Sequence, residues 1–176
     1  PNGTATKEMM YEVFCEQCEG LAAGGIDAFC IETMSDLDEI SLAIKAAKEN
    51  TNLPVMATMT FDKGPRGLFT MMGVTPHQAA IQLHNAGADV VGSNCGNGIE
   101  VMVQIAREMR EATDGLLVIN SNAGIPELIK GKVVYTETPE FLASFWNDLI
   151  KIGVDIIGGC CGTTPLHIKA LANSRG

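Results

Sequence analysis

The chain has 176 residues, 46% of them apolar and 19% charged, and this balance indicates one folded domain rather than a disordered chain. Its formal net charge of −9, without a basic cluster, argues against a nucleic-acid partner and against adhesion to an anionic membrane. No apolar run is long enough to cross a bilayer and no signal peptide is visible, so we expect a cytoplasmic protein.

Along the chain, long amphipathic segments alternate with short apolar segments rich in β-branched residues. The expected helices are Thr6–Ala23, Ser35–Glu49, Pro76–Ala86, Gly98–Ala112 and Pro139–Ile152, with a last helix from Pro165. The expected strands between them are Asp27–Thr33, Pro54–Phe61, Asp89–Cys95, Leu116–Asn122 and Asp155–Cys160. This alternation predicts a parallel sheet covered by helices.

Capping signals support these boundaries. Ser35 with Asp38 resembles a capping box. Threonine–proline pairs at Thr75, Thr138 and Thr164 place an N-cap before a proline at the first helical position. Three helices end in similar phrases, AAGGID, NAGADV and KIGVDI, each with a glycine that can take the left-handed conformation before the next strand.

Two α/β architectures fit this pattern, an open doubly wound sheet and a (β/α)8 barrel. No glycine-rich dinucleotide fingerprint follows a strand, which weakens the open-sheet interpretation. Five strands are too few for a closed barrel. If the fold is a TIM-type barrel, residues 1–176 are its C-terminal portion, about five βα units, and about three N-terminal units are absent from this chain.

The start of the chain agrees with absent N-terminal units. The chain opens on Pro1 with no initiator methionine, so we expect it to begin within a longer natural sequence. The strands Asp27–Thr33 and Asp155–Cys160 would be sheet edges, and exposed edges pair with other chains. We therefore expect self-association through these edges unless the missing units cover them.

Sulfur and polar side chains follow the expected strands, where parallel α/β folds collect their functional groups. Cys95 ends the third strand, and Cys160 and Cys161 end the fifth. The glycines beside the adjacent pair can end strand geometry, so that both sulfurs turn to one side. Three converging thiolates suit Zn²⁺ and leave a fourth position open, as in catalytic zinc sites.

The other cysteines have plainer interpretations. Without a targeting signal, a disulfide framework is the weaker reading of six cysteines. Cys30 lies within a strand between Phe29 and Ile31, and we expect it to be buried. Cys15 and Cys18 form a CxxC inside a helical segment, which favours helix packing over chemistry.

Three polar residues at strand ends have two readings each. Glu32 offers a partner for an ammonium group, or is simply an acid placed before a helix. Asn94 and Asn122 could orient ligands or bond the loops to one another.

The segments DVVGSNCGNG, NSNAG and DIIGGCCGTTPLHI together resemble the zinc-dependent homocysteine S-methyltransferase family. The resemblance implies a (β/α)8 barrel in which Cys95, Cys160 and Cys161 hold zinc and Glu32 contacts the amino group of homocysteine. Asn94 joins Glu32 as a candidate substrate-binding residue. The Asp-Gly segment of the family's first strand, which also helps to bind substrate, has no counterpart in this chain.

The resemblance further implies transfer of a methyl group to the homocysteine thiol, giving methionine. The glycine-rich segment Met59–Gly73 is similar to the cobalamin-linked branch of the family. It suggests a corrinoid or folate-linked donor, methylcobalamin or methyltetrahydrofolate, on another domain or protein. The alternatives are a thiol redox or metal-sequestering protein, a scaffold with structural zinc, and a corrinoid-dependent methyltransferase with a different acceptor.

Overall fold

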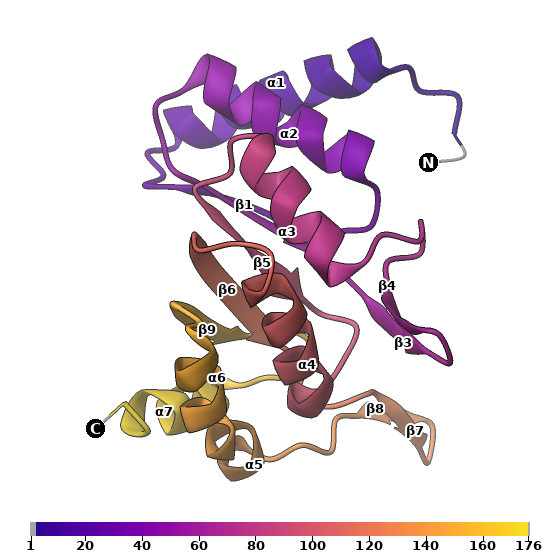
Figure 1. Cartoon of the computed structure of the whole chain (residues 1–176), viewed down its shortest axis with the longest axis vertical. Coiled ribbons are helices and arrows are strands. Elements are labelled where there is room, and N and C mark those ends of the chain that lie inside the picture. Colours follow the sequence, from indigo (N-terminus) through magenta and orange to yellow (C-terminus); the bar gives the residue numbers. More distant parts are fainter. Residues whose placement is uncertain (1–2, 176) are drawn as a thin grey trace.

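The computed structural model describes residues 3–175, in which helices and strands alternate (Figure 1). The strands of the main sheet are β1 (Phe29–Met34), β2 (Val55–Met59), β5 (Val90–Asn94), β6 (Leu116–Ser121) and β9 (Ile156–Gly159). The helices are α1 (Lys7–Ala23), α2 (Leu37–Asn50), α3 (Pro76–Asn85), α4 (Ile99–Arg110), α5 (Pro139–Ser144), α6 (Trp146–Ile152) and α7 (Pro165–Asn173). The five expected strands are thus confirmed, with boundaries that differ by at most two residues.

All neighbouring strands of this sheet are parallel, in the order β1-β2-β5-β6-β9. The fold is therefore α/β, and its strand–helix units are those of a (β/α)8 barrel that is present in part. β1 and β9 lie at the two ends of the strand order, so the two predicted sheet edges are confirmed.

The two faces of the sheet differ in burial. Alternate residues pack against the helices and are almost fully buried: Phe29, Val55, Ala57, Val91, Leu117 and Ile119. The helices meet this face with apolar residues of helical spacing, of which Ile40, Ile44, Met102 and Met109 are completely buried. On the opposite face Leu116 and Ile156 are exposed, as are Cys30 and Glu32.

Two aspartates repeat one device at the amino ends of the strands. The carboxylate of Asp89, just before β5, accepts a 2.7 Å hydrogen bond from the Val55 amide at the start of β2. The carboxylate of Asp155, just before β9, accepts one of 2.9 Å from the Leu117 amide of β6. Each aspartate thereby fixes the register of its strand against the neighbouring strand.

Most of the predicted caps are present. Thr75, Thr138 and Thr164 are N-caps followed by proline, and Gly25, Gly87 and Gly153 have φ values of +81°, +100° and +91°. The prediction of a capping box formed by Ser35 and Asp38 was wrong. Asp36 caps α2 instead and accepts a 3.0 Å hydrogen bond from the Glu39 amide, because a carboxylate at this position also complements the helix dipole.

The structure also contains elements that the sequence pattern did not predict. Two hairpins, β3 (Asp62–Gly64) with β4 (Gly67–Phe69) and β7 (Glu127–Ile129) with β8 (Lys132–Val134), project from the same side of the molecule (Figure 1). The single helix expected over Pro139–Ile152 is divided at Phe145 into α5 and α6. Within residues 3–175, no helix is both long and apolar enough to cross a membrane.

Candidate metal centre

Three thiols from distant parts of the chain converge at the carboxyl ends of the strands. The Sγ atoms of Cys95, Cys160 and Cys161 all lie within 4.8 Å of one another, and those of Cys95 and Cys161 are 3.7 Å apart. Cys95 follows β5 and the pair follows β9, with β6 between them in the sheet. In a tetrahedral site with Zn–S bonds of about 2.3 Å, two sulfurs are about 3.8 Å apart, so this spacing suits zinc.

Backbone geometry after β9 explains how adjacent cysteines reach one site. The Cys160 amide still bonds to the Ser121 carbonyl of β6 at 2.7 Å, whereas the Cys161 amide bonds to the Asn122 side chain at 3.0 Å. Gly162 follows with a φ of +79°, and its missing side chain leaves room for the Tyr135 ring. The strand therefore ends at Gly159, as the flanking glycines predicted.

Cys95 itself has an unusual conformation. Its φ is +62°, in the left-handed region that few non-glycine residues occupy, and Gly96 follows at +76°. A Cβ at Gly96 would press against the side chain of Thr60 and the Phe61 carbonyl. Residues in such conformations collect at functional sites, and here the Cys95 thiol lies 3.7 Å from the Cys161 thiol.

Asn94 is fully buried beneath the thiols, and both of its amide atoms are occupied. Its Oδ1 accepts hydrogen bonds of 2.7 Å from the Thr33 amide and from the Thr58 hydroxyl. Its Nδ2 donates to the Thr33 hydroxyl at 2.8 Å and to the Cys160 sulfur at 3.6 Å. Asn94 therefore joins the ends of β1, β2 and β9 and has no amide position left for a ligand.

Without metal, the Cys160 thiol is a weaker acid than an ordinary cysteine thiol. Burial raises the pKa of the Cys160 thiol to about 11, and the hydrogen bond from Asn94 only partly offsets this effect. Cys160 is therefore protonated at neutral pH unless a cation replaces the proton. A soft divalent ion such as Zn²⁺ does this, so the three sulfur donors fit zinc chemically as well as by distance.

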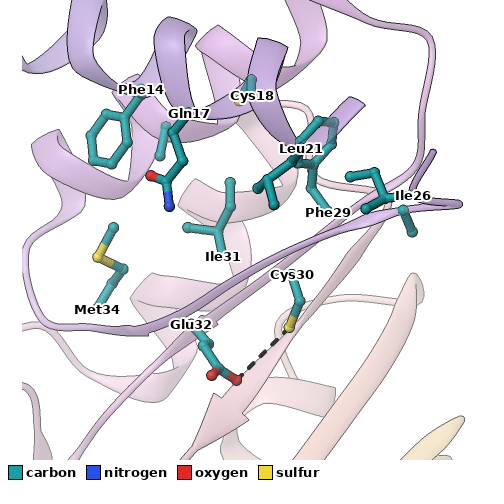
Figure 2. A pocket seen from close by; sticks show the side chains of 12 residues that line it. Phe14, Gln17, Cys18, Leu21, Ile26, Phe29, Cys30, Ile31, Glu32 and Met34 are labelled. Carbon is teal, nitrogen blue, oxygen red and sulfur yellow. Dashed lines mark hydrogen bonds between the residues drawn. The ribbon is translucent and has the colours of Figure 1, made fainter. Parts of the chain in front are cut away.

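Glu32 lies outside the thiol cluster, near the end of β1. Figure 2 shows Glu32 and Cys30 on one face of the strand, with their side chains 3.9 Å apart, and the apolar residues of a cavity of about 440 Å³ on the other. The next residue, Thr33, has a φ of +64° and is held by Asn94. Glu32 is thus exposed at the edge of the site and connected to it through Thr33.

The prediction that Cys30 is buried was wrong. Its neighbours Phe29 and Ile31 point toward the helices, so alternation places Cys30 on the opposite face of an edge strand, where it is exposed. The interpretation of Cys15 and Cys18 as packing residues of α1 is confirmed, because Cys18 is 7% exposed within the core and Cys15 packs against it.

Three further residues belong to this region. Asn122 joins two loops. Its side chain accepts a hydrogen bond from the Cys161 amide, and its own amide donates to the Asn97 carbonyl at 3.1 Å. Desolvation and the nearby Cys161 raise the pKa of Tyr135, which lies against Gly162. Glu137 caps α4, whose N-cap Gly98 has no side chain, by accepting a 3.2 Å hydrogen bond from the Ile99 amide. Tyr135 and Glu137 were not singled out from the sequence, because they lie in an irregular segment without a motif.

A sequence model of the homocysteine S-methyltransferase family matches residues 1–174. The chain belongs to this family. It is 29% identical to the methionine synthase of Mycobacterium tuberculosis over 167 residues, which cover 92% of this chain and 14% of that protein. It is 30% identical to betaine–homocysteine S-methyltransferase 1 of Mus musculus over 178 residues, which cover 92% of this chain and 42% of that protein.

The fold has a close structural counterpart. The apo form of the homocysteine methyltransferase MmuM from Escherichia coli superposes with a TM-score of 0.78 at 21% identity, and covers 99% of this chain and 60% of that one. This chain therefore spans less than two thirds of these family members.

Proposed function

We propose that this chain forms the metal-binding part of a zinc-dependent methyltransferase that transfers a methyl group to the thiol of homocysteine and yields methionine. The observation that carries the proposal is the convergence of Cys95, Cys160 and Cys161 at a spacing that suits tetrahedral zinc. Family membership supplies the acceptor. A second structure of MmuM from Escherichia coli is of a metallated form, which agrees with a metal in that relative.

The residues of this chain would bind the metal and orient the substrate thiol. Cys95, Cys160 and Cys161 would hold a zinc ion through three thiolates, and a three-cysteine site would have room for the substrate sulfur as a fourth donor. Zinc bound there would supply deprotonation of a substrate thiol, whose thiolate is the nucleophile. The new sulfur–carbon bond forms as the bond between the methyl carbon and its donor breaks, and the thiol proton passes to solvent. The loops after β5 and β9 hold the reacting sulfur in line.

Glu32 is the proposed partner of the substrate's ammonium group. It is exposed and acidic, and Asn94 fixes the neighbouring Thr33 through two hydrogen bonds. We propose that Asn94 itself acts by positioning Thr33 and Cys160 rather than by contact with substrate. The support is that the protein already occupies both amide atoms of Asn94.

The proposal includes parts outside this chain. About three further βα units would close the barrel between β1 and β9, since both strands are unpaired edges of the five-stranded sheet. The methyl donor is proposed to be corrinoid or folate-linked and carried by another domain, in keeping with the methionine synthase relatives, of which this chain covers 14%. Pairing of these edges with a second copy remains a prediction. A cytoplasmic location is proposed because zinc-binding thiols must stay reduced.

Metal analysis of the folded 176-residue chain tests the proposal. We expect about one zinc per chain, and loss of that zinc when Cys95, Cys160 or Cys161 is changed to Ala. Cys15→Ala is the matched control, because Cys15 lies in α1 and should leave zinc content unchanged. In the cobalt-substituted chain, homocysteine should alter the visible absorption bands, whereas homoserine should not. A folded chain that binds no zinc would contradict the proposal.

A further inference from the structure

Glu137 contacts the helices that follow the two thiol-bearing loops, α4 through the Ile99 amide and α7 through His167, although it lies in neither helix. The cysteines follow β5 and β9, which are separated in the sheet by β6. Sheet pairing alone therefore does not set the distance between Cys95 and Cys161. The loops beyond the strands must set it.

The first connection runs through the turn after β6. The Asn122 amide donates to the carbonyl of Asn97 at 3.1 Å, and its side chain accepts from the Cys161 amide at 3.0 Å. The Ala123 amide donates to the Cys161 carbonyl at 2.9 Å. This turn therefore touches the Cys95 loop on one side and the Cys161 loop on the other.

Glu137 completes the connection through three groups. Its carboxylate accepts from the Ile99 amide at 3.2 Å and so holds the first turn of α4, just after the Cys95 loop. Its amide donates to the Ala123 carbonyl at 3.0 Å. Its carbonyl lies 3.0 Å from Nε2 of His167, on the helix that follows Cys161.

The local sequence is built around this arrangement. A side chain at Gly98 would collide with the Glu137 carboxylate, and the Cβ of a side chain at Gly124 would lie tightly, at 3.1 Å, against Cγ of Glu137. His167 is 6% exposed and its Nδ1 accepts from the Thr164 amide at 3.1 Å. Nε2 therefore carries the proton and donates to Glu137, which fixes the histidine tautomer.

We propose that Glu137 and His167 are positioning residues for the thiol cluster, which set the distance between Cys95 and the Cys160–Cys161 pair. As far as it concerns zinc, this inference rests on the proposed function. Neither side chain contacts a sulfur. Their effect passes through the first turn of α4 and the start of α7.

Zinc competition against a chromophoric chelator, with the full chain, is the first test. Glu137→Ala should weaken zinc binding about tenfold or more, as is usual for residues that orient metal ligands. Glu137→Gln should restore most of the affinity, because its amide oxygen still accepts from the Ile99 amide. The His167→Gln variant should likewise bind zinc more tightly than the His167→Ala variant, because glutamine keeps a donor for the Glu137 carbonyl. Glu140→Ala is the control, since it removes the same charge from an exposed position of α5.

A spectroscopic and a metal-free measurement separate positioning from general stability. The thiolate-to-cobalt bands of the Co²⁺-loaded chain should shift in Glu137→Ala and return in Glu137→Gln. Phenylarsine oxide, which bridges two neighbouring thiols, measures the spacing without metal. In a background with Cys15→Ser and Cys160→Ser, it should bind Cys95 and Cys161 about tenfold more weakly once Glu137 is changed to Ala.

The outcomes distinguish the two proposals. If the parent chain binds no zinc but Glu137→Ala still weakens the arsenic bridge, the metal function fails and the positioning role stands. If all folded Glu137 and His167 variants bind zinc and arsenic as tightly as the parent, the positioning role is overturned.

Discussion

The Sγ atoms of Cys95 and Cys161 lie 3.7 Å apart, although the two cysteines are 66 residues apart in the chain. Oxidation of the metal-free protein should therefore link this pair. A Cys160–Cys161 bridge would be strained because the residues are adjacent, and the Cys160 thiol is turned toward Asn94. Peptide mapping by mass spectrometry after mild oxidation identifies the linked pair.

The zinc-loaded chain is the control for oxidation, because bound metal should protect all three thiols. A dominant Cys15–Cys18 or Cys160–Cys161 disulfide would instead favour the thiol redox interpretation of the sequence. It would also show that the 3.7 Å approach of Cys95 and Cys161 does not govern reactivity.

Zinc affinity should rise with pH. Burial raises the pKa of Cys160 to about 11, so the metal must displace a proton from this thiol throughout the neutral range. Each proton released makes the apparent affinity up to about tenfold tighter per pH unit. Competition titrations at about pH 6 and about pH 8 measure the slope. An affinity that is independent of pH would show that the thiols do not lose protons on binding.

Asn94→Ala should destabilise the fold by roughly 3 kcal/mol, because it leaves the buried Thr58 hydroxyl and partners on two further strand ends, Thr33 and Cys160, without these hydrogen bonds. Urea unfolding followed by circular dichroism measures the change in the free energy of unfolding. Asn120→Ala is the matched control, since Asn120 pairs with Asn94 across the sheet but is only half-buried. Equal losses in the two variants would contradict a special role for Asn94.

Acid should weaken the amino end of the sheet through Asp89. The Lys48 ammonium, 2.7 Å away, holds the pKa of this carboxyl below its usual range. The stability that the ionised carboxylate contributes is therefore present above the unfolded pKa of about 3.9 and is lost as the pH falls through the lower folded value. Asp89→Asn should cost about 0.5–1 kcal/mol at neutral pH, a small amount because the pair is partly exposed.

The difference between Asp89→Asn and the parent should disappear in acid, as urea unfolding at several pH values would reveal. Asp114→Asn, in the exposed loop before β6, is the control and should follow the parent at every pH. A difference between Asp89→Asn and the parent that persists unchanged in acid would contradict the ion-pair explanation.

The sequence predicted the sheet because strands such as Val55–Met59 and Val90–Asn94 are bounded by capped helices. It did not predict the hairpins, whose three-residue strands are too short for a periodic pattern. Nor did it predict the break at Phe145, where φ is −87° and ψ is 0° without a proline or glycine. Tertiary packing, and not local preference, sets such features.

At the site, the convergence of the three thiols could be predicted from the sequence, because the cysteines follow strands and have glycines beside them. The same reasoning failed for Cys30, because apolar neighbours say nothing about which face of an edge strand a side chain occupies. It also missed Glu137, which reaches the N-terminus of α4 from 38 residues further along the chain. Contacts that join distant irregular segments have no local signal.

Cys95 has a φ of +62°, a conformation that costs a non-glycine residue about 1 kcal/mol or more. Glycine would fit this position better, yet it would remove a sulfur. Cys95→Gly would therefore lose one of the three proposed zinc ligands while relieving the backbone. At this one position the residue best for folding differs from the residue that the proposed zinc site requires, so engineering for thermal stability alone would select against that site.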